Sequence, residues 1–169
     1  SSLFEIAEDV FNDVQIVGDI AVSNYSLQFD GVDYSSSPID QNLIDDAESK
    51  IPNSLKESIQ KAYQNIYKFH ASQSESIKKI ETTQGVICWR ESRPIEKVGI
   101  YIPGGSAPLF STVLMLGIPA KIAGCKEIVL CTPPNENGEV NPLILYTANL
   151  VGIDKVYANV LPDQKQQII

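Results

Sequence analysis

The chain has 169 residues, of which 43% are hydrophobic and 20% charged, and its formal net charge is −8. This composition is that of an ordinary globular protein with enough apolar residues to form a core. The acidic balance repels phosphate backbones and anionic headgroups, so it argues against nucleic-acid binding and against docking on membranes. Residues 1–10 carry Glu5, Glu8 and Asp9, which is unlike a secretory signal peptide.

The first half of the chain is predicted to be helical. Apolar residues recur at spacings of three and four over residues 3–30, with a break at Gly18-Asp19. Residues 31–40 form a polar loop, and a short helix and a long amphipathic helix follow, the long one over residues 55–73. The predicted caps are Asp40 or Asn42 for the short helix, which runs through Ser49, and Ser54 for the long one, with Glu57 completing a capping box.

The pattern changes after about residue 75. Residues 77–83 alternate weakly between apolar and polar positions, and residues 85–90 form a better strand. Together they predict a hairpin or an extended arm. The charged segment 91–97 contains Pro94 and connects this arm to the rest of the chain.

Strands and helices then alternate to the end of the chain. This order predicts a parallel sheet with right-handed crossovers. Pro119 interrupts the first helix, and we favour two helical pieces, with Pro119 opening the second, over a single kinked helix. The predicted strands are 98–102, 127–131 and 155–160, and the predicted helices are 109–123 and 143–151, ended by Gly124 and Gly152.

A glycine turn joins the first of these strands to its helix. Residues 103–106 read Pro-Gly-Gly-Ser. Glycines let a backbone approach a ligand closely, and the N–H groups at a helix start favour a phosphate. The spacing matches neither G-x-G-x-x-G nor a P-loop, so the residues by themselves favour a tight turn without a ligand over a nucleotide site.

The cysteines and the single histidine suggest no metal site. Cys88, Cys125 and Cys131 have no C-x-x-C spacing and lie among apolar neighbours, which favours buried, reduced thiols in a cytoplasmic protein. His70 lies at the polar end of a predicted helix, where a surface or interface position is expected.

The stretch from Arg93 to Pro108, Arg-Pro-Ile-Glu-Lys-Val-Gly-Ile-Tyr-Ile-Pro-Gly-Gly-Ser-Ala-Pro, resembles the signature of histidinol dehydrogenases. Its continuation through residues 111–115, 118–125 and 127–134 resembles the same family, and the resemblance covers residues from about 10 to 160. Upstream, the matching positions are Gly18-Asp19, Phe29-Asp30-Gly31, Phe69-His70, Gln73, Glu81-Thr82, Gly85-Val86 and Trp89.

The resemblance implies a fold, a reaction and partners. It implies an α/β fold with a helical region and extended arm in residues 1–84, and an incomplete Rossmann-like NAD-binding unit in residues 85–169. The layout is similar, more distantly, to the cofactor domain of aldehyde dehydrogenases. Family members are homodimers that use NAD and a bound zinc to oxidise L-histidinol to L-histidine in histidine biosynthesis.

The resemblance also places a cofactor site on this chain. Tyr101 falls on a position that contacts NAD in the family, and a tyrosine offers a flat apolar face and a hydroxyl tip. Packing of that ring at a strand end is the alternative. The other cofactor-binding candidates are Pro103, Gly104 and Gly105 in the glycine turn, with Thr132 and Pro133 at the next strand end.

The family's catalytic and zinc-binding residues have no counterpart in this sequence. Its zinc ligands (a Gln, two His and an Asp) and its Glu-His acid/base pair lie downstream of the matching region, and residues 159–169 look foreign to the family pattern. We therefore expect no catalytic and no metal-binding residue in this chain, and no histidinol oxidation by the chain alone. The competing interpretations are a non-catalytic assembly or binding module derived from the enzyme, or an unrelated small α/β binder. Uncovered sheet edges and apolar helix faces predict self-association.

Overall fold

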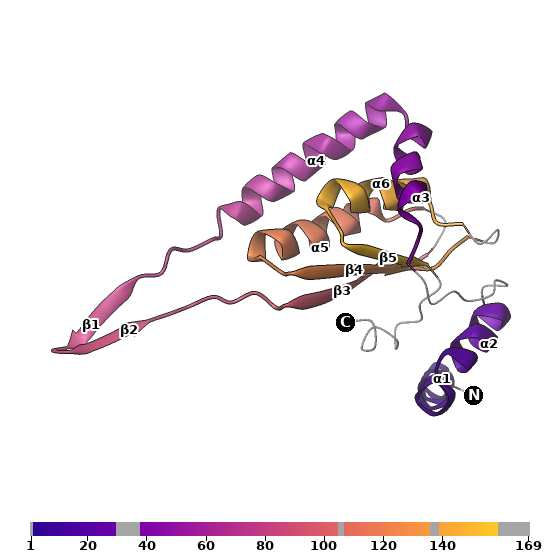
Figure 1. Cartoon of the computed structure of the whole chain (residues 1–169), viewed down its shortest axis with the longest axis horizontal. Helices are drawn as coiled ribbons and strands as arrows, with labels where there is room; N and C mark the ends of the chain where they lie inside the picture. Colours follow the sequence, from indigo (N-terminus) through magenta and orange to yellow (C-terminus); the bar gives the residue numbers. More distant parts are fainter. Residues whose placement is uncertain (1, 30–37, 105–106, 136–138, 159–169) are drawn as a thin grey trace.

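The structure is a computed structural model that describes residues 2–29, 38–104, 107–135 and 139–158. Three parts are distinct in Figure 1: a pair of N-terminal helices, a long two-stranded arm, and an α/β unit on which further helices pack. Gly105, Ser106, most of the predicted loop 31–40 and the end of the strand predicted over 155–160 lie outside the described residues.

The N-terminal helices α1 (Leu3–Val17) and α2 (Asp19–Phe29) form a helical hairpin. Ser2 and Glu5 form a capping box at the start of α1. Gly18 has φ 59°, a left-handed angle that glycine adopts without strain, so the chain turns there as predicted. The two helices bury a small cluster of their own, made of Val10, Val14, Ala21 and Val22.

The helices α3 (Gln41–Ala47) and α4 (Asn53–Ala71) are separated by a 3₁₀ turn, Glu48–Lys50. Asp40 caps α3 as predicted, its carboxylate accepting from the Asn42 N–H at 2.8 Å. The predicted capping box at Ser54 is wrong, because α4 starts earlier and Pro52 holds the N-cap position. A capping residue needs non-helical backbone angles, and Ser54 is already inside the first turn.

Strands β1 (Lys79–Thr83) and β2 (Val86–Trp89) confirm the predicted antiparallel hairpin. The turn between them contains Gly85 at φ 82°. Every residue of both strands is exposed, and the arm extends away from the α/β unit in Figure 1. The expectation of a buried thiol is therefore wrong for Cys88, because none of the described segments packs as a second layer on this two-stranded ribbon.

The α/β unit confirms the predicted parallel sheet and the α/β fold class. Its strands lie in the order β3-β4-β5, with α5 and α6 connecting them on one face. Buried aliphatic side chains of that face pack against the helices, among them Ile100, Leu130 and Val156. The element bounds are β3 Lys97–Tyr101, α5 Phe110–Ala123, β4 Glu127–Thr132, α6 Pro142–Val151 and β5 Lys155–Ala158.

Pro119 does not divide its helix, so the favoured two-piece interpretation is wrong: α5 is one helix with the proline inside it. Leu114 and Ile118, before the proline, are buried against Ile59 of α4 and Val151 of α6. This packing holds the turn preceding the proline helical despite the lost N–H donor. Gly124 and Gly152 end the two crossover helices in left-handed conformation, as predicted.

The helices α3 and α4 share a core with the sheet unit. Ile44 and Ala47 of α3 belong to the same buried cluster as the strand residues, and the Ile39 N–H donates to the Val156 carbonyl at 2.8 Å. The proposed division between residues 84 and 85 falls in the turn of the arm. It remains a prediction.

Candidate cofactor site at the strand ends

The glycine turn and the segment after β4 begin at the same edge of the sheet. Parallel strands end at one edge, and β3 and β4 are in register there, Tyr101 opposite Cys131. The Ile102 N–H donates to the Cys131 carbonyl at 2.9 Å, which extends the pairing one residue past β3. The two loops therefore leave the sheet side by side.

Gly104 and Pro133 bring these two loops into contact. A Cβ on Gly104 would lie 2.8 Å from the Pro133 Cγ, closer than real side chains approach. Glycine is therefore needed here for space. The consequence is a narrow junction of two exposed or half-exposed loops at the carboxyl edge of a parallel sheet, the place where open α/β sheets bind ligands.

Tyr101 lies on the sheet face opposite α5 and α6. It packs with Val129, Cys131 and Tyr157 in a cluster of that face, and Tyr101, Cys131 and Tyr157 are register partners in one row across the three strands. Tyr101 itself is half-buried. No local pattern predicts this row, because residues 128–131 are a continuous apolar run that is buried on both faces of the sheet.

The other candidates occupy different environments. Thr132 is buried, 4% exposed, and by strand alternation its side chain shares the helix-covered face with Leu130, away from Tyr101. Pro103 and Gly104 are exposed, and Pro133 is half-buried. Gly105 lies outside the described residues. The fold thus brings Gly104 and Pro133 together and places Tyr101 and Thr132 on opposite faces of the same edge.

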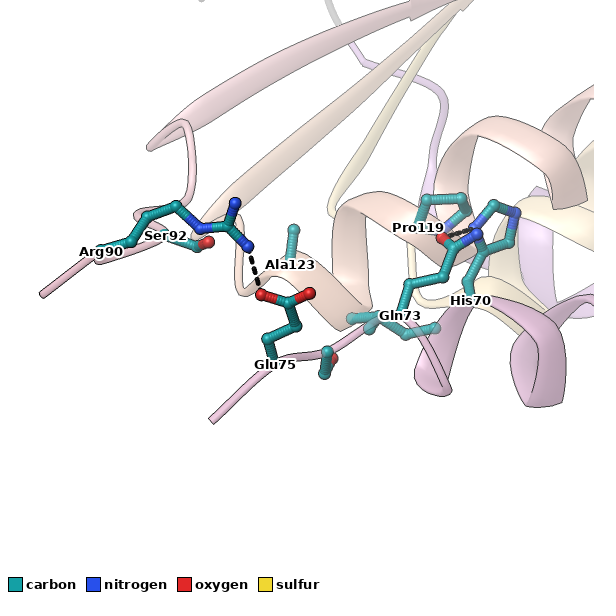
Figure 2. A pocket seen from close by; sticks show the side chains of 9 residues that line it. His70, Gln73, Glu75, Arg90, Ser92, Pro119 and Ala123 are labelled. Atoms are coloured by element: carbon teal, nitrogen blue, oxygen red, sulfur yellow. Dashed lines mark hydrogen bonds and ion pairs between the residues drawn. The ribbon is translucent and has the colours of Figure 1, made fainter. Parts of the chain in front are cut away.

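Away from this junction, a cavity of about 420 Å³ lies at the joint between α4, the arm and the end of α5. Figure 2 shows its polar groups pairing with one another: the His70 Nδ1 lies 3.0 Å from the Gln73 Oε1, and Arg90 pairs with Glu75 across the base of the arm. Because α5 runs antiparallel to the strands, this joint is at the opposite end of the helix from the glycine turn. His70, expected at a surface or interface, is half-buried in it.

Charged side chains at the amino edge of the sheet form ion pairs that link the strands to one another, and we do not assign them to a ligand site. The Glu127 carboxylate lies 2.7 Å from the Lys155 Nζ and 3.5 Å from the Lys97 Nζ, so it joins all three strands. The hydrogen bond from Lys155 is the main cause that lowers the pKa of Glu127 below its ordinary value.

Within the described ranges, no three His, Cys, Asp or Glu side chains are grouped so that they could hold a metal ion. No helix in the same ranges is long and apolar enough to cross a membrane.

Comparison with known proteins shows which family shares this architecture. The family model for histidinol dehydrogenase matches residues 1–159. A histidinol dehydrogenase of Bacteroides fragilis is 50% identical over 156 residues, 92% of this chain and 36% of that protein. One of Vibrio parahaemolyticus is 48% identical over 149 residues, 88% of this chain and 34% of that protein. The crystal structure of histidinol dehydrogenase from Elizabethkingia anophelis aligns with a TM-score of 0.87 at 54% identity, over 94% of this chain and 36% of that chain.

A parallel β-α-β-α-β unit with both crossover helices on one face is an incomplete Rossmann-like unit, a class of α/β fold that many oxidoreductases use. With the matches above, the chain belongs to the histidinol dehydrogenase family, a family of oxidoreductases. It corresponds to the N-terminal portion of these relatives and spans about a third of their length.

Proposed function

We propose that this chain forms part of an NAD-dependent, zinc-containing histidinol dehydrogenase that oxidises L-histidinol to L-histidine in histidine biosynthesis. Family membership supports the reaction, and the strand-end junction of Gly104 and Pro133 supports a cofactor role for this portion. We place the protein in the cytoplasm, in keeping with its three free cysteines.

The carboxyl edge of β3 and β4 is where we place the dinucleotide. NAD, when bound, supplies the hydride acceptor. Tyr101 would present its ring face and hydroxyl to the cofactor, and the turn at Pro103 and Gly104 would bring backbone within reach of its phosphates. We keep Gly105, Thr132 and Pro133 as further contacts. Thr132 would act from the helix-covered side, because its side chain does not share the face of Tyr101.

Zinc does not fit the described part of this chain, whose nitrogen, sulfur and carboxylate donors are not grouped. We therefore derive no step through the metal. At the strand-end junction, the described residues 101–104 and 132–135 include no histidine, aspartate or glutamate to accept the hydroxyl proton of an alcohol. We assign the acid/base chemistry, the metal and the histidinol site to the part of the relatives that this chain does not match.

Titration of NAD against the purified chain by calorimetry tests the cofactor assignment. We expect Tyr101→Ala to weaken binding at least about tenfold, equivalent to about 1.4 kcal/mol, and Tyr101→Phe to weaken it less. Tyr67→Ala on the exposed side of α4 is the matched control and should leave the affinity unchanged. Equal NAD affinity in Tyr101→Ala and the unmodified chain would reject the site. Zinc-dependent NADH formation from histidinol by this chain alone would reject the assignment of the acid/base groups to the unmatched part.

We also expect a homodimer. The exposed helical hairpin and arm favour association over an isolated chain, and they equally favour the alternative function, a non-catalytic assembly module. The NAD titration separates the two, since an assembly module has no need to bind the cofactor.

A further inference from the structure

The cavity at the base of the arm is large enough for a small ligand and lies away from the strand-end junction. Its volume is about 420 Å³, within the range of about 300–1,000 Å³ that is usual for small-molecule pockets. It lies where α4 and α5 both end, whereas the glycine turn precedes the other end of α5. Two segments join the arm to the rest of the chain, residues 72–78 and 90–96, and they line the remaining side of the cavity. We call these segments the legs of the arm.

One wall of the cavity is apolar and preformed. Pro119, Ile122 and Ala123 line it, and their spacing places them on one face of α5. Ile122 also packs against the cluster that joins α5 to α4, in which Ile59 and Ile118 are each 1% exposed. Because this cluster holds the two helices together, the wall keeps its shape without a ligand.

One end of the cavity carries a single ion pair. Arg90 of one leg pairs with Glu75 of the other (Figure 2), and the two side chains are 80% and 72% exposed. An exposed pair of this kind contributes little to stability, so a ligand can separate it at little cost. The nearest charges along the same leg, Glu91 and Arg93, pair with each other and do not line the cavity. Among the described residues, and apart from the imidazole of His70, the cavity therefore presents one positive and one negative charge.

The other end of the cavity offers a donor and an acceptor side by side. The His70 Nδ1 lies 3.0 Å from the Gln73 Oε1, and an amide oxygen only accepts, so the Nδ1 donates. The neutral ring then has an acceptor at Nε2, and the Gln73 Nε2 is a donor. Neither nitrogen has another hydrogen-bond partner among the residues that the structure describes. Figure 2 shows this pair and the ion pair apart, with Ala123 between them.

These groups select a class of ligand by charge. A simple anion meets Glu75 and a protein of net charge −8, and a simple cation meets Arg90. A zwitterion meets neither penalty, because it restores a charged contact to each side chain that it separates. The apolar wall suits a short aliphatic stem, and the pair at the far end suits a group that both donates and accepts.

We propose that this cavity binds a zwitterionic α-amino acid whose side chain ends in an amide. Its carboxylate accepts from the Arg90 guanidinium, whose fork matches a carboxylate, and its ammonium donates to Glu75. Its side-chain amide donates to the His70 Nε2 and accepts from the Gln73 Nε2. Such a ligand ties both legs of the arm to the end of α4. The site is separate from the cofactor site, and its test does not involve NAD.

Calorimetric titration of L-glutamine into the purified chain tests the proposal. We expect saturable binding of one molecule per chain. Two matched compounds each lack one group: L-norvaline has a methyl in place of the amide, and glutaramate lacks only the ammonium. Each should bind at least about tenfold more weakly than L-glutamine. The absence of saturable heat up to about 10 mM L-glutamine, or equal binding of glutaramate, would overturn the proposal.

Variants of the lining residues locate the binding site. Arg90→Gln and Glu75→Gln each remove one charge from an exposed position, and each should weaken L-glutamine binding at least about tenfold. Ala123→Leu narrows the cavity without changing its charge and should have a similar effect. Arg93→Gln is the matched control, because Arg93 is equally exposed on the same leg but does not line the cavity, and it should leave the affinity unchanged.

Circular dichroism first establishes that the four variants are folded. A second readout is the unfolding midpoint, which L-glutamine should raise in the unmodified chain and in Arg93→Gln but not in the other three variants. Unchanged affinity in Arg90→Gln or in Ala123→Leu would show that L-glutamine binds elsewhere and would overturn the assignment.

Discussion

Gly104 packs so closely on Pro133 that a single added methyl group would lie 2.8 Å from the proline Cγ. The two residues belong to different loops, and their contact keeps the carboxyl ends of β3 and β4 together. The ring of a proline cannot rotate away as a long side chain can, so the geometry of this junction depends on the glycine.

Gly104→Ala should therefore destabilise the protein by about 1–3 kcal/mol, as overpacking does, and weaken NAD binding at the same time. Urea unfolding and calorimetry measure the two effects. Pro133→Ala introduced beside Gly104→Ala removes the ring and should recover much of the stability. A double variant as unstable as Gly104→Ala alone would show that the clash is not with Pro133.

Gly117 of α5 makes an equally close approach to α6. A Cβ there would lie 2.7 Å from the Val151 Cγ1 and 3.2 Å from the Ile153 Cδ1. Alanine improves helix propensity by about 1 kcal/mol, but Val151 is buried and stiff, so we expect Gly117→Ala to lower the free energy of unfolding overall. A double-mutant cycle measured by urea unfolding tests this contact. Gly117→Ala should cost less free energy of unfolding when Val151→Ala is also present, and additive costs would contradict the contact.

Asp154 joins the end of α6 to the start of β4. Its backbone N–H donates to the Ile128 carbonyl at 3.0 Å, and its carboxylate accepts from the Ile128 N–H at 2.8 Å and from Lys121 at 3.2 Å. Asp154→Ala should cost about 1–3 kcal/mol, because the part-buried Ile128 N–H loses its acceptor. Asp154→Asn keeps an acceptor and should cost less. If thermal unfolding shows the same loss of stability for the two variants, the ion pair with Lys121 and not the Ile128 hydrogen bond accounts for the effect.

Glu127 should make stability depend on pH in the acid range. Its folded-state pKa is lowered, first by the hydrogen bond from Lys155, so its stabilisation is complete above the ordinary glutamate pKa and is lost as pH falls through the lowered folded value. Unfolding midpoints of the unmodified chain and Glu127→Gln should differ at neutral pH and converge in acid. Lys155→Met removes the hydrogen-bond partner of Glu127. In that background Glu127→Gln should therefore change the unfolding midpoint at neutral pH by a smaller amount. A difference that does not vary with pH would contradict this account.

The three thiols should differ in reactivity by position. Cys88 is exposed, Cys125 half-buried and Cys131 1% exposed in the sheet. With a colorimetric disulfide reagent we expect Cys88 to react at once and Cys131 only on unfolding. Cys88→Ser should abolish the fast phase, and a fast phase that survives this change would place the reactive thiol elsewhere.

Local patterns in the sequence already determined most of the secondary structure. The break at Gly18, the cap at Asp40 and the left-handed ends at Gly124 and Gly152 follow from the backbone preferences of single residues. The alternation of strands and helices after residue 98 determined a parallel sheet, and a long signature around the glycine turn indicated the family. Each of these features can be predicted from the sequence because it depends only on residues that are close together in the chain.

Contacts between distant segments decided the rest. Pro119 stays within one helix because Leu114 and Ile118 pack on α4 and α6. These contacts cannot be predicted from the residues around the proline alone. Cys88 is exposed because no described segment of the chain stacks on the arm, although its neighbours in the sequence are apolar. Thr132 and Tyr101 face opposite sides of the sheet through the register of β3 with β4, and Gly104 meets Pro133 only because those strands end at one edge. Register and layer packing join residues far apart in the chain, and the free energy that fixes them comes from burial in the folded state.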